Sequence, residues 1–275
     1  MRRASVLIPT HNHASTLPLS VASVQDQGVD DIEILIVGDG VGDDTRAAVG
    51  ALQAADPRIR FFDRPKGPRL GEAHRDAILR QAQGRIVCYQ CDDDLWLPGH
   101  LEALERALTD ADFAGAMQVD VDPGDRVRGY FFDLEHPAFT EPWLAWTPNQ
   151  LGDWASDGFG LAFGAHTLEA YLRLPLGWST TPPGLPTDQF MWHKFMREAG
   201  RRTAFLRTPI ALHFPAKDRL DWTPAQRADE LTRWRAMIEQ PGAATRLRDD
   251  LLGDLGERLL QQALRERTER EGEPA

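Results

Sequence analysis

The sequence predicts an α/β protein in which helices flank a mostly parallel β-sheet. Short apolar, β-branched segments alternate four times with helical segments in the first 110 residues. This alternation is typical of a doubly wound sheet, because neighbouring parallel strands need a crossover helix between them. The expected strands are residues 5–9, 32–37, 59–62 and 86–89, and the expected helices are residues 14–27, 43–54, 70–83 and 98–108.

The pattern is less regular after residue 108. Tryptophan, proline and glycine are frequent in residues 136–164, where we expect loops with a short strand near Leu161. From Pro224 to about Arg270, an apolar stripe with many Arg/Glu pairs predicts helices, broken near Pro241. Further strands are expected at residues 113–121, 127–132, 204–206 and 210–213, and a further helix at residues 185–199. We expect one domain at residues 1–215, with halves at 1–110 and 111–215, and a C-terminal helical extension at residues 216–275.

The acidic composition excludes some classes of partner. The chain has 31 Lys and Arg residues against 42 Asp and Glu residues, and its formal net charge is −11. Nucleic acids attract proteins with a positive field, so we expect no nucleic-acid partner. No run of about 18 apolar residues occurs, so we expect no transmembrane segment. The apolar part of the N-terminus is too short for a signal peptide, and we expect a cytoplasmic protein.

Three consecutive carboxylates, Asp92–Asp94, follow the apolar strand at residues 86–89. Carboxylates at the end of a buried strand repel one another and lose hydration, which favours a cation or a donor-rich ligand in front of them. The alternative is a solvated acidic turn. The two cysteines, Cys88 and Cys91, form a C-x-x-C motif. Because Cys88 lies within the apolar strand, we expect a core residue there rather than a redox or metal pair.

The order of the segments predicts where a ligand binds. In a doubly wound sheet, ligands bind in the crevice outside the carboxyl ends of the strands. Polar segments follow each of the first four strands, namely Thr10–Asn12, Asp39, the cationic loop Arg64–Arg69 and Asp92–Asp94. We therefore expect these segments to lie along one edge of the sheet. The histidines near these loops, His11, His13, His74 and His100, show no spacing typical of zinc sites.

Four motifs, in this order, resemble family 2 glycosyltransferases. Residues 6–12, Val-Leu-Ile-Pro-Thr-His-Asn, resemble the opening V-I-I-P-T-Y-N of that family, and residues 34–40, Ile-Leu-Ile-Val-Gly-Asp-Gly, resemble its strand ending in V-D-D-G-S. Residues 91–98, Cys-Asp-Asp-Asp-Leu-Trp-Leu-Pro, resemble its D-x-D-D-x-W-x-P segment, the DXD region. Thr187-Asp188 resembles its E-D pair. The resemblance covers residues 5–108 well and reaches His213 weakly.

The resemblance implies a GT-A fold, which is a Rossmann-like domain that binds a nucleotide-diphosphosugar. It also implies transfer of the sugar with inversion, commonly with Mg²⁺ or Mn²⁺. Asp188 is the implied general base, and the implied metal ligands are Asp93, Asp94 and His213. The residues implied to bind the nucleotide are Pro9, Thr10, Asn12, Asp39, Arg69 and Asp92. The residues themselves leave a helix N-cap as the alternative for Asp188, and a core or surface histidine as the alternative for His213.

The sequence leaves the acceptor and the class of protein open. The acceptor is a saccharide, a lipid-linked glycan or a small molecule, and the C-terminal helices offer a surface for homo-oligomerisation. Gly38, Cys91 and Thr187 stand where the family usually has acids. One alternative is therefore a non-catalytic nucleotide- or sugar-binding module. Another is a nucleotidyltransferase, although residues 10–15 contain none of the Gly, Arg or Lys residues usual in its first loop.

Overall fold

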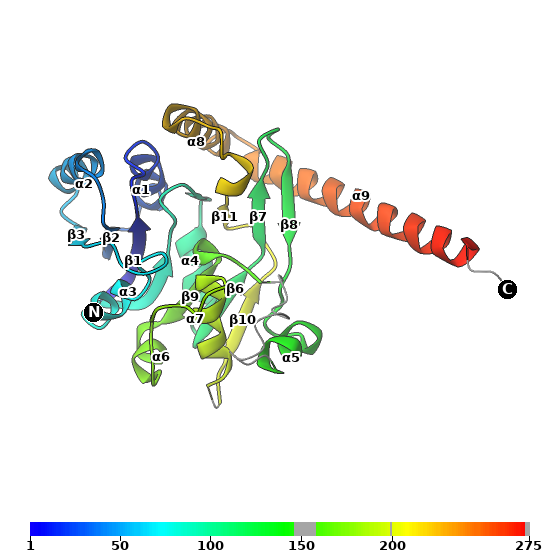
Figure 1. Ribbon diagram of the computed structural model, residues 1–275, viewed down its shortest axis with the longest axis horizontal. Helices are drawn as coiled ribbons and strands as arrows, with labels where there is room; N and C mark the ends of the chain where they lie inside the picture. Colours follow the sequence, from blue (N-terminus) through cyan, green and yellow to red (C-terminus); the bar gives the residue numbers. More distant parts are fainter. Residues whose placement is uncertain (146–157, 199, 273–275) are drawn as a thin grey trace.

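The computed structural model describes residues 1–145, 158–198 and 200–272 and confirms the α/β architecture. A seven-stranded sheet has helices packed against it (Figure 1). Its strand order is β10-β6-β9-β4-β1-β2-β3, and all neighbours are parallel except β9, which runs antiparallel to β4 and β6. The strands are β1 (Arg2–Thr10), β2 (Ile32–Asp39), β3 (Ile59–Arg64), β4 (Gly84–Tyr89), β6 (Phe113–Ala116), β9 (Gly164–Thr167) and β10 (Thr203–Leu206).

The central strands are apolar along their length because both faces of the sheet are covered. Val6, Leu7 and Ile8 of β1 are fully buried, although successive side chains of a strand point to opposite faces. The helices are α1 (Leu17–Gln25), α2 (Asp43–Ala55), α3 (His74–Leu79), α4 (His100–Ala107), α5 (Pro137–Ala145), α6 (Leu168–Arg173), α7 (Thr187–Met196), α8 (Pro224–Ile238) and α9 (Ala243–Gly272). Short 3₁₀ segments lie at Leu161–Phe163 and Ala216–Asp218.

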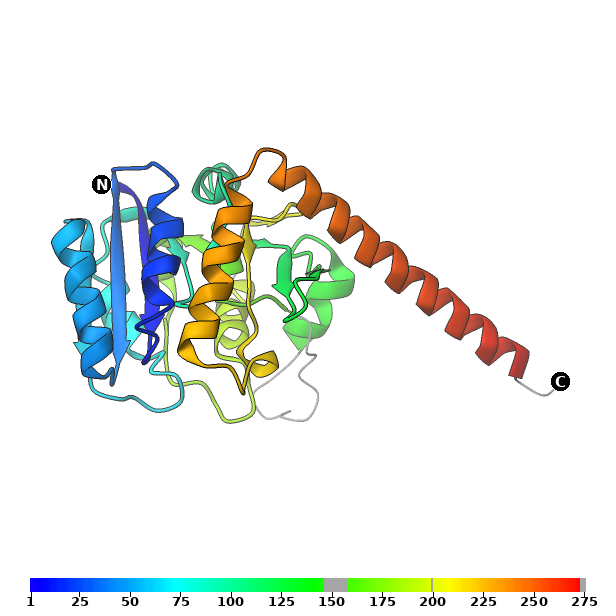
Figure 2. The same cartoon turned by 90° about the horizontal axis from the view of Figure 1, so that it is seen from above.

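The expected C-terminal helices are present as α8 and α9. Helix α8 contacts α1, which also contacts α2 (Figure 2). Helix α9 begins against β8 (Val127–Tyr130) and then extends away from the body of the protein (Figures 1 and 2). Within residues 1–145, 158–198 and 200–272, no helix combines the length and apolar character needed to cross a membrane.

The single strand expected at residues 113–121 is wrong, because the chain changes sheets at Met117. Residues 113–116 form β6 of the main sheet, whereas β7 (Gln118–Val121) pairs with β8 in a separate antiparallel ribbon. Residues 113–117 are continuously apolar and residues 118–121 alternate between polar and apolar, and neither pattern identifies the partner of a strand. The loop expected at residues 137–145 is instead helix α5, which tolerates Pro142 in its interior.

Trp143 of α5 is a core residue. It is 2% exposed, and its ring centroid lies 4.5 Å from that of Phe132. This burial assigns Trp143 to core packing and leaves no exposed ring face for stacking on a ligand. The other two tryptophans of that loop, Trp146 and Trp154, lie outside the described residues.

The helix expected to begin at Pro98 begins two residues later, at His100. The preceding residues form the short strand β5 (Leu95–Trp96), which pairs antiparallel with β11 (Ala211–Leu212). Gly99 has φ +81° and turns the chain from this strand into α4, where the His100 ring stacks on Trp96 at 3.8 Å. The β5–β11 pair brings His213, directly after β11, beside the acidic segment directly before β5.

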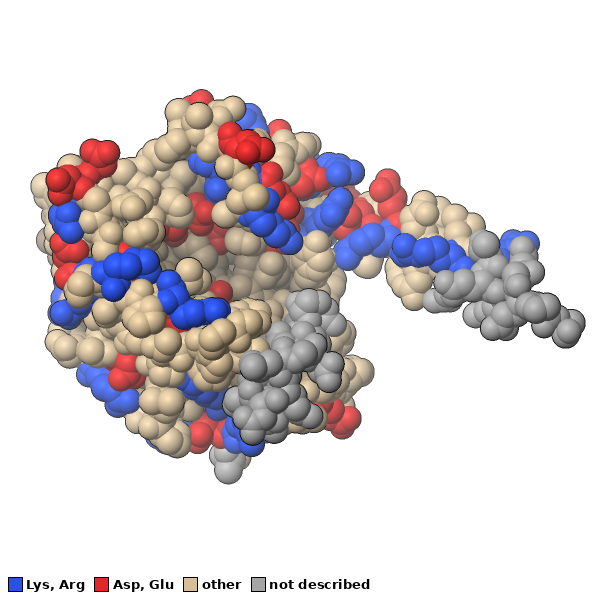
Figure 3. All heavy atoms as spheres, in the orientation of Figure 1, with Lys and Arg blue, Asp and Glu red and all other residues tan. Residues whose placement is uncertain are grey.

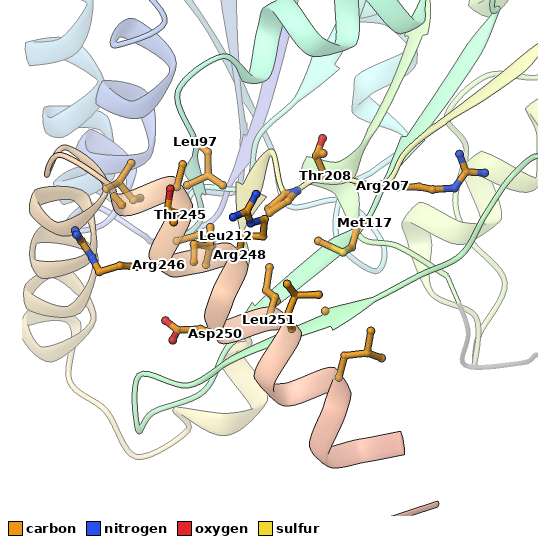
Figure 4. A pocket seen from close by; sticks show the side chains of 18 of the residues that line it. Leu97, Met117, Arg207, Thr208, Leu212, Thr245, Arg246, Arg248, Asp250 and Leu251 are labelled. Carbon is orange, nitrogen blue, oxygen red and sulfur yellow. The ribbon is translucent and has the colours of Figure 1, made fainter. Parts of the chain in front are cut away.

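A cavity of about 660 Å³ lies between the body and the start of α9 (Figure 4). Its lining is mainly apolar and includes Leu97, Met117, Leu212, Trp234 and Leu251. None of the residues that the sequence assigns to the donor, the metal or the base lines this cavity.

Candidate active site

The polar segments after the first four strands meet at one edge of the sheet, as their order predicts. Strand β1 lies between β2 and β4 and is parallel to both, so their carboxyl ends are neighbours. These ends carry Thr10, Asp39 and Asp92–Asp94. The face shown in Figure 3 is hollowed, with acidic side chains inside the hollow and basic side chains along its rim.

Asp92 and Asp93 each pair with one cation from a distant part of the chain. His13, in the loop after β1, places Nδ1 2.8 Å from Asp92 Oδ1. Arg227, on α8, places Nη2 2.9 Å from Asp93 Oδ2. The hydrogen bond to Asp92 raises the pKa of His13 to about 8. Burial, together with the charges of Asp94 and Asp92, raises the pKa of Asp93 to about 6. The crowding expected for this strand end is therefore present, and a cation would relieve it.

Asp94 pairs with the third cation, His213. It is 1% exposed and accepts hydrogen bonds from His213 Nδ1 at 2.9 Å and from the Phe214 N–H at 3.1 Å. Burial disfavours the ionised form of Asp94, but the charge and hydrogen bonds of its partners outweigh burial and lower its pKa. Burial likewise lowers the pKa of His213, yet the charge and hydrogen bond of Asp94 prevail and raise it to about 9. Because Nδ1 faces Asp94, Nε2 is the nitrogen left for another ligand.

A group of atoms suited to a metal ion is formed by His13, Asp92 and Asp93, whose ligand atoms all lie within 4.8 Å of one another. Carboxylate oxygen and imidazole nitrogen are ligands that Mn²⁺ accepts, and carboxylates also suit Mg²⁺. Of the expected set, this group contains Asp93 but not Asp94 or His213. The sequence placed His13 near the crevice without giving it a role, because only folding shows that it faces Asp92.

Asp39, at the end of β2, is held by the loop after β3. It is 5% exposed, and its carboxylate accepts a hydrogen bond from Lys66 Nζ. The same carboxylate accepts a second hydrogen bond, of 2.6 Å, from the Gly67 N–H. Gly71 approaches so closely that a Cβ there would lie 2.2 Å from Asp39 Cγ. The cationic loop therefore fixes the carboxylate at the edge where a nucleotide is expected.

The other residues expected to bind the nucleotide differ in what they contact. Pro9 and Thr10 end β1, and Thr10 Oγ1 is buried with no hydrogen-bond partner among the described residues. Asn12 has φ +56°, and its Oδ1 accepts a hydrogen bond from the Gly42 N–H at the start of α2. Arg69 has φ +57° and donates to the Leu185 carbonyl at 2.8 Å, which ties its loop to the segment before α7.

Asp188 lies in the first turn of α7. The N-cap is Pro186, so the alternative assignment of Asp188 as the N-cap is wrong. Its side chain is 25% exposed, Thr187 Oγ1 donates to it at 3.1 Å, and Arg75 Nη1 lies 3.9 Å from its Oδ1. Burial raises the pKa of Asp188, and the charge of Arg75 opposes this rise.

Arg75 was not identified from the sequence. It is 3% exposed, stacks at 4.3 Å over the Trp178 ring, and has Nε and Nη1 buried without hydrogen-bond partners among the described residues. The sequence does contain one sign that Arg75 is buried. It lies three residues before the buried Ile78 on α3, and this spacing places both side chains on the inner face of the helix.

Cys88 is a core residue, as the sequence predicts, whereas Cys91 is half-buried. Cys88 is fully buried, and burial raises its thiol pKa far above the usual range. Cys91 is also a free thiol whose pKa is raised by burial and by the charges of Asp94 and Asp93. High thiol pKa values do not suit a redox pair.

Comparison with known proteins identifies the family. Residues 5–175 match the model of glycosyl transferase family 2. Over 104 residues the chain is 35% identical to the GalNAc(5)-diNAcBac-PP-undecaprenol beta-1,3-glucosyltransferase of Campylobacter jejuni, covering 38% of this chain and 34% of that protein. Over 123 residues it is 35% identical to the succinoglycan biosynthesis protein ExoO of Rhizobium meliloti, covering 44% and 33%. The chain thus spans about a third of the length of these curated relatives.

Solved structures share the fold at low sequence identity. Staphylococcus aureus TarS, residues 1–349, has a TM-score of 0.59 and 14% identity, covering 83% of this chain and 69% of that one. The mannosyltransferase PcManGT from Pyrobaculum calidifontis, in complex with GDP-Man and Mn²⁺, has a TM-score of 0.52 and 17% identity, covering 90% and 79%. These similarities support the GT-A fold. Because the family model matches more than half of its residues, the chain belongs to glycosyl transferase family 2.

Proposed function

We propose that the protein is an inverting glycosyltransferase that moves a sugar from a nucleotide-diphosphosugar to an acceptor hydroxyl, assisted by Mg²⁺ or Mn²⁺. The observation that carries this proposal is the acidic cluster at the sheet edge. Its carboxylates are crowded enough to raise the pKa of Asp93, and the ligand atoms of His13, Asp92 and Asp93 lie within 4.8 Å of one another. Family membership supports the same reaction.

The metal would be held by Asp93, with the ligand atoms of Asp92 and His13 within 4.8 Å, and by His213 through Nε2 once this nitrogen has lost its proton. Asp94 acts on it through His213, because its hydrogen bond to Nδ1 orients the ring and fixes which nitrogen faces outward. Asp92, which we expect to face the ribose, stays close enough to share the ion's charge. When bound, a divalent cation supplies Lewis-acid stabilisation of the departing nucleoside diphosphate.

Asp188 is the proposed general base. Its part-buried carboxylate accepts the proton of the acceptor hydroxyl as that oxygen attacks the sugar on the face opposite the leaving group. Burial strengthens its affinity for a proton, and the charge of Arg75 opposes this effect by favouring the ionised form. General-base catalysis of this kind contributes a factor of about 10² to 10⁴ in rate.

The nucleotide occupies the crevice between the ends of β1, β2 and β4. Pro9, Thr10, Asn12, Asp39, Arg69 and Asp92 are the proposed binding residues. The buried Thr10 hydroxyl, which lacks a partner among the described residues, supports a ligand there. Solved neighbours bound to GDP-Man or UDP-GlcNAc make UDP and GDP the first probes, and a lipid-linked glycan is the acceptor class that the C. jejuni relative suggests.

The test is thermal stabilisation by nucleoside diphosphates with Mn²⁺. We expect UDP or GDP at millimolar concentration to raise the melting temperature, and Asp93→Asn to abolish the rise. Asp112→Asn is the matched control, because Asp112 has a side-chain exposed fraction of 13% against 14% for Asp93 and also pairs with arginine. A wild-type protein that neither nucleotide stabilises would contradict the proposal.

A non-catalytic binding module is the second candidate, favoured by Gly38 and Cys91 at positions where the family usually has acids. Slow hydrolysis of the bound donor separates the two candidates, because a glycosyltransferase usually hydrolyses its donor and a binding module does not. Pyrophosphate release from a nucleoside triphosphate would instead indicate a nucleotidyltransferase.

A further inference from the structure

Helix α8 brings a guanidinium into the acidic cluster from outside the segment that matches the family. Residues 5–175 match the family model, whereas α8 spans Pro224–Ile238. Arg227 donates through Nη2 to Asp93 Oδ2 at 2.9 Å and to the Phe214 carbonyl at 3.2 Å. The contact joins residues 134 positions apart in the sequence, so it depends on how α8 docks.

Contacts within α8 and with the segment before it hold the helix in place. A capping box between Thr223 and Gln226 fixes the first turn of α8. Arg227 is the residue directly after Gln226. The fully buried pair of Arg219 and Glu230, with contacts of 2.6 Å, fastens the helix to the segment before it. Arg227 is therefore held at the cluster by a rigid element rather than by a loose surface loop.

The guanidinium of Arg227 has capacity for a second anion. Its side chain is 12% exposed, and its Nε is buried without a hydrogen-bond partner among the described residues. Arginine carries five N–H donors in a planar fork that matches phosphate oxygens, and the contacts to Asp93 and Phe214 use Nη2 only.

We propose that Arg227 is the resident counter-cation of Asp93, and that it binds the diphosphate of the donor once a divalent cation has taken its place. Resting on the proposed function, this inference gives the helix a role in the site. A guanidinium and a divalent cation repel each other at the same carboxylate oxygen, so one must leave when the other binds. The released guanidinium remains beside the cluster, where the diphosphate brings negative charge that it can bind in bidentate fashion.

The proposal predicts opposite effects of one substitution on two binding steps. Arg227→Gln should bind Mn²⁺ alone about tenfold more tightly than the wild type, because Asp93 no longer has to release a cation. With saturating Mn²⁺, the same variant should bind UDP or GDP about tenfold more weakly, because a phosphate ligand is missing. Electron paramagnetic resonance of free Mn²⁺ measures the first step, and titration calorimetry measures the second.

Arg235→Gln is the matched control. Arg235 lies on the same helix but pairs with Asp26 at 2.7 Å, away from the cluster, so neither affinity should change. If Arg227→Gln does not fold, Arg227→Lys should show smaller changes in the same two directions, because lysine keeps the charge but lacks the fork. Unchanged affinities, or weaker Mn²⁺ binding, would overturn the inference. Failure of the proposed function would give a different result, because the wild type would then bind neither UDP nor GDP. The Mn²⁺ affinities of the wild type and Arg227→Gln would still test whether Arg227 is the counter-cation of Asp93.

Discussion

Asp188, the proposed general base, has a carboxylate whose affinity for a proton depends on two opposing effects. Burial raises its pKa, and Arg75 at 3.9 Å opposes that rise. Arg75 itself is stacked on Trp178 and almost inaccessible, so it reaches Asp188 from a fixed position. The two residues lie on α7 and α3, far apart in sequence, which is why sequence motifs alone point to the acid and not to its partner.

Asp188→Asn should separate binding from transfer. The amide keeps the size of the side chain but cannot accept a proton, so we expect a loss of about 10² to 10⁴ in the rate of sugar transfer. The melting-temperature shift caused by UDP or GDP with Mn²⁺ should stay the same. If that shift also disappears, Asp188 supports the structure of the site rather than the reaction.

Gly71 carries two constraints that a substitution can distinguish. Its φ is +62°, and a Cβ would collide with Asp39 at 2.2 Å. Gly71→Ala should therefore reduce the free energy of unfolding by about 1–3 kcal/mol and weaken nucleotide binding by displacing Asp39. Gly28→Ala is the control, because Gly28 has φ +65° and open space around it. It should show the backbone cost only, and equal effects of both variants on nucleotide binding would refute the role of Gly71.

His100 should make stability fall in acid. It is fully buried, and burial lowers its pKa to about 3, so the unfolded chain binds a proton near pH 6.5 that the folded chain does not. Stability is therefore lost as the pH falls from about 6.5 towards 3, and between pH 7 and pH 5 this one group costs about 2 kcal/mol. His100→Asn keeps a donor for the Ile210 carbonyl. In urea unfolding, the free energy of unfolding of this variant should fall by about 2 kcal/mol less than that of the wild type between pH 7 and pH 5. Burial also lowers the pKa of His166 to about 3, so the variant should still lose the stability that His166 contributes as the pH falls.

At the scale of the elements, α8 depends on a buried ion pair. Arg219 and Glu230 are both fully buried, and Arg219 also donates to the Val121 and Pro215 carbonyls. Glu230→Gln leaves the guanidinium without a compensating charge and should lower the free energy of unfolding by about 3–5 kcal/mol. Asp26→Asn breaks the exposed pair with Arg235 and should cost less than about 1 kcal/mol. Similar values from chemical denaturation for both variants would contradict this assignment.

The elements that the sequence predicts best are those whose packing is uniform along their length. Strands β1, β2 and β4 are buried on both faces, so continuous apolar runs reveal them. The sequence-based assignments are wrong where tertiary contacts determine the secondary structure. Residues 113–121 split at Met117 because β6 and β7 have different partners, and α5 forms despite Pro142 because Trp143 is buried.

At the scale of the whole molecule, the site joins segments that only the fold brings together. The sequence could place Asp39 and Asp92–Asp94 at one sheet edge, since strand order determines that edge. It could not show that His13, His213 and Arg227 face the three acids, because those contacts depend on the path of the loop after β1 and on the docking of β11 and α8. The domain division at residue 215 stays a prediction, and Arg227 is a contact across it.

Helix α9 carries the exposed leucines Leu252, Leu259, Leu260 and Leu264. The expectation that the C-terminal helices associate with a second copy stays a prediction. Sedimentation over a range of concentrations tests it, since association raises the apparent mass with concentration.

The one-to-one pairing of the acids has a consequence for the order in which ligands bind. At neutral pH, three carboxylates face three protonated or cationic groups, so the cluster carries almost no net charge within a chain of net charge −11. A free nucleoside diphosphate therefore gains no net attraction from these three acids and their partners. Only after a divalent ion has entered does the cluster become positive, and we therefore expect an ordered sequence in which the metal binds before the nucleotide or arrives with it.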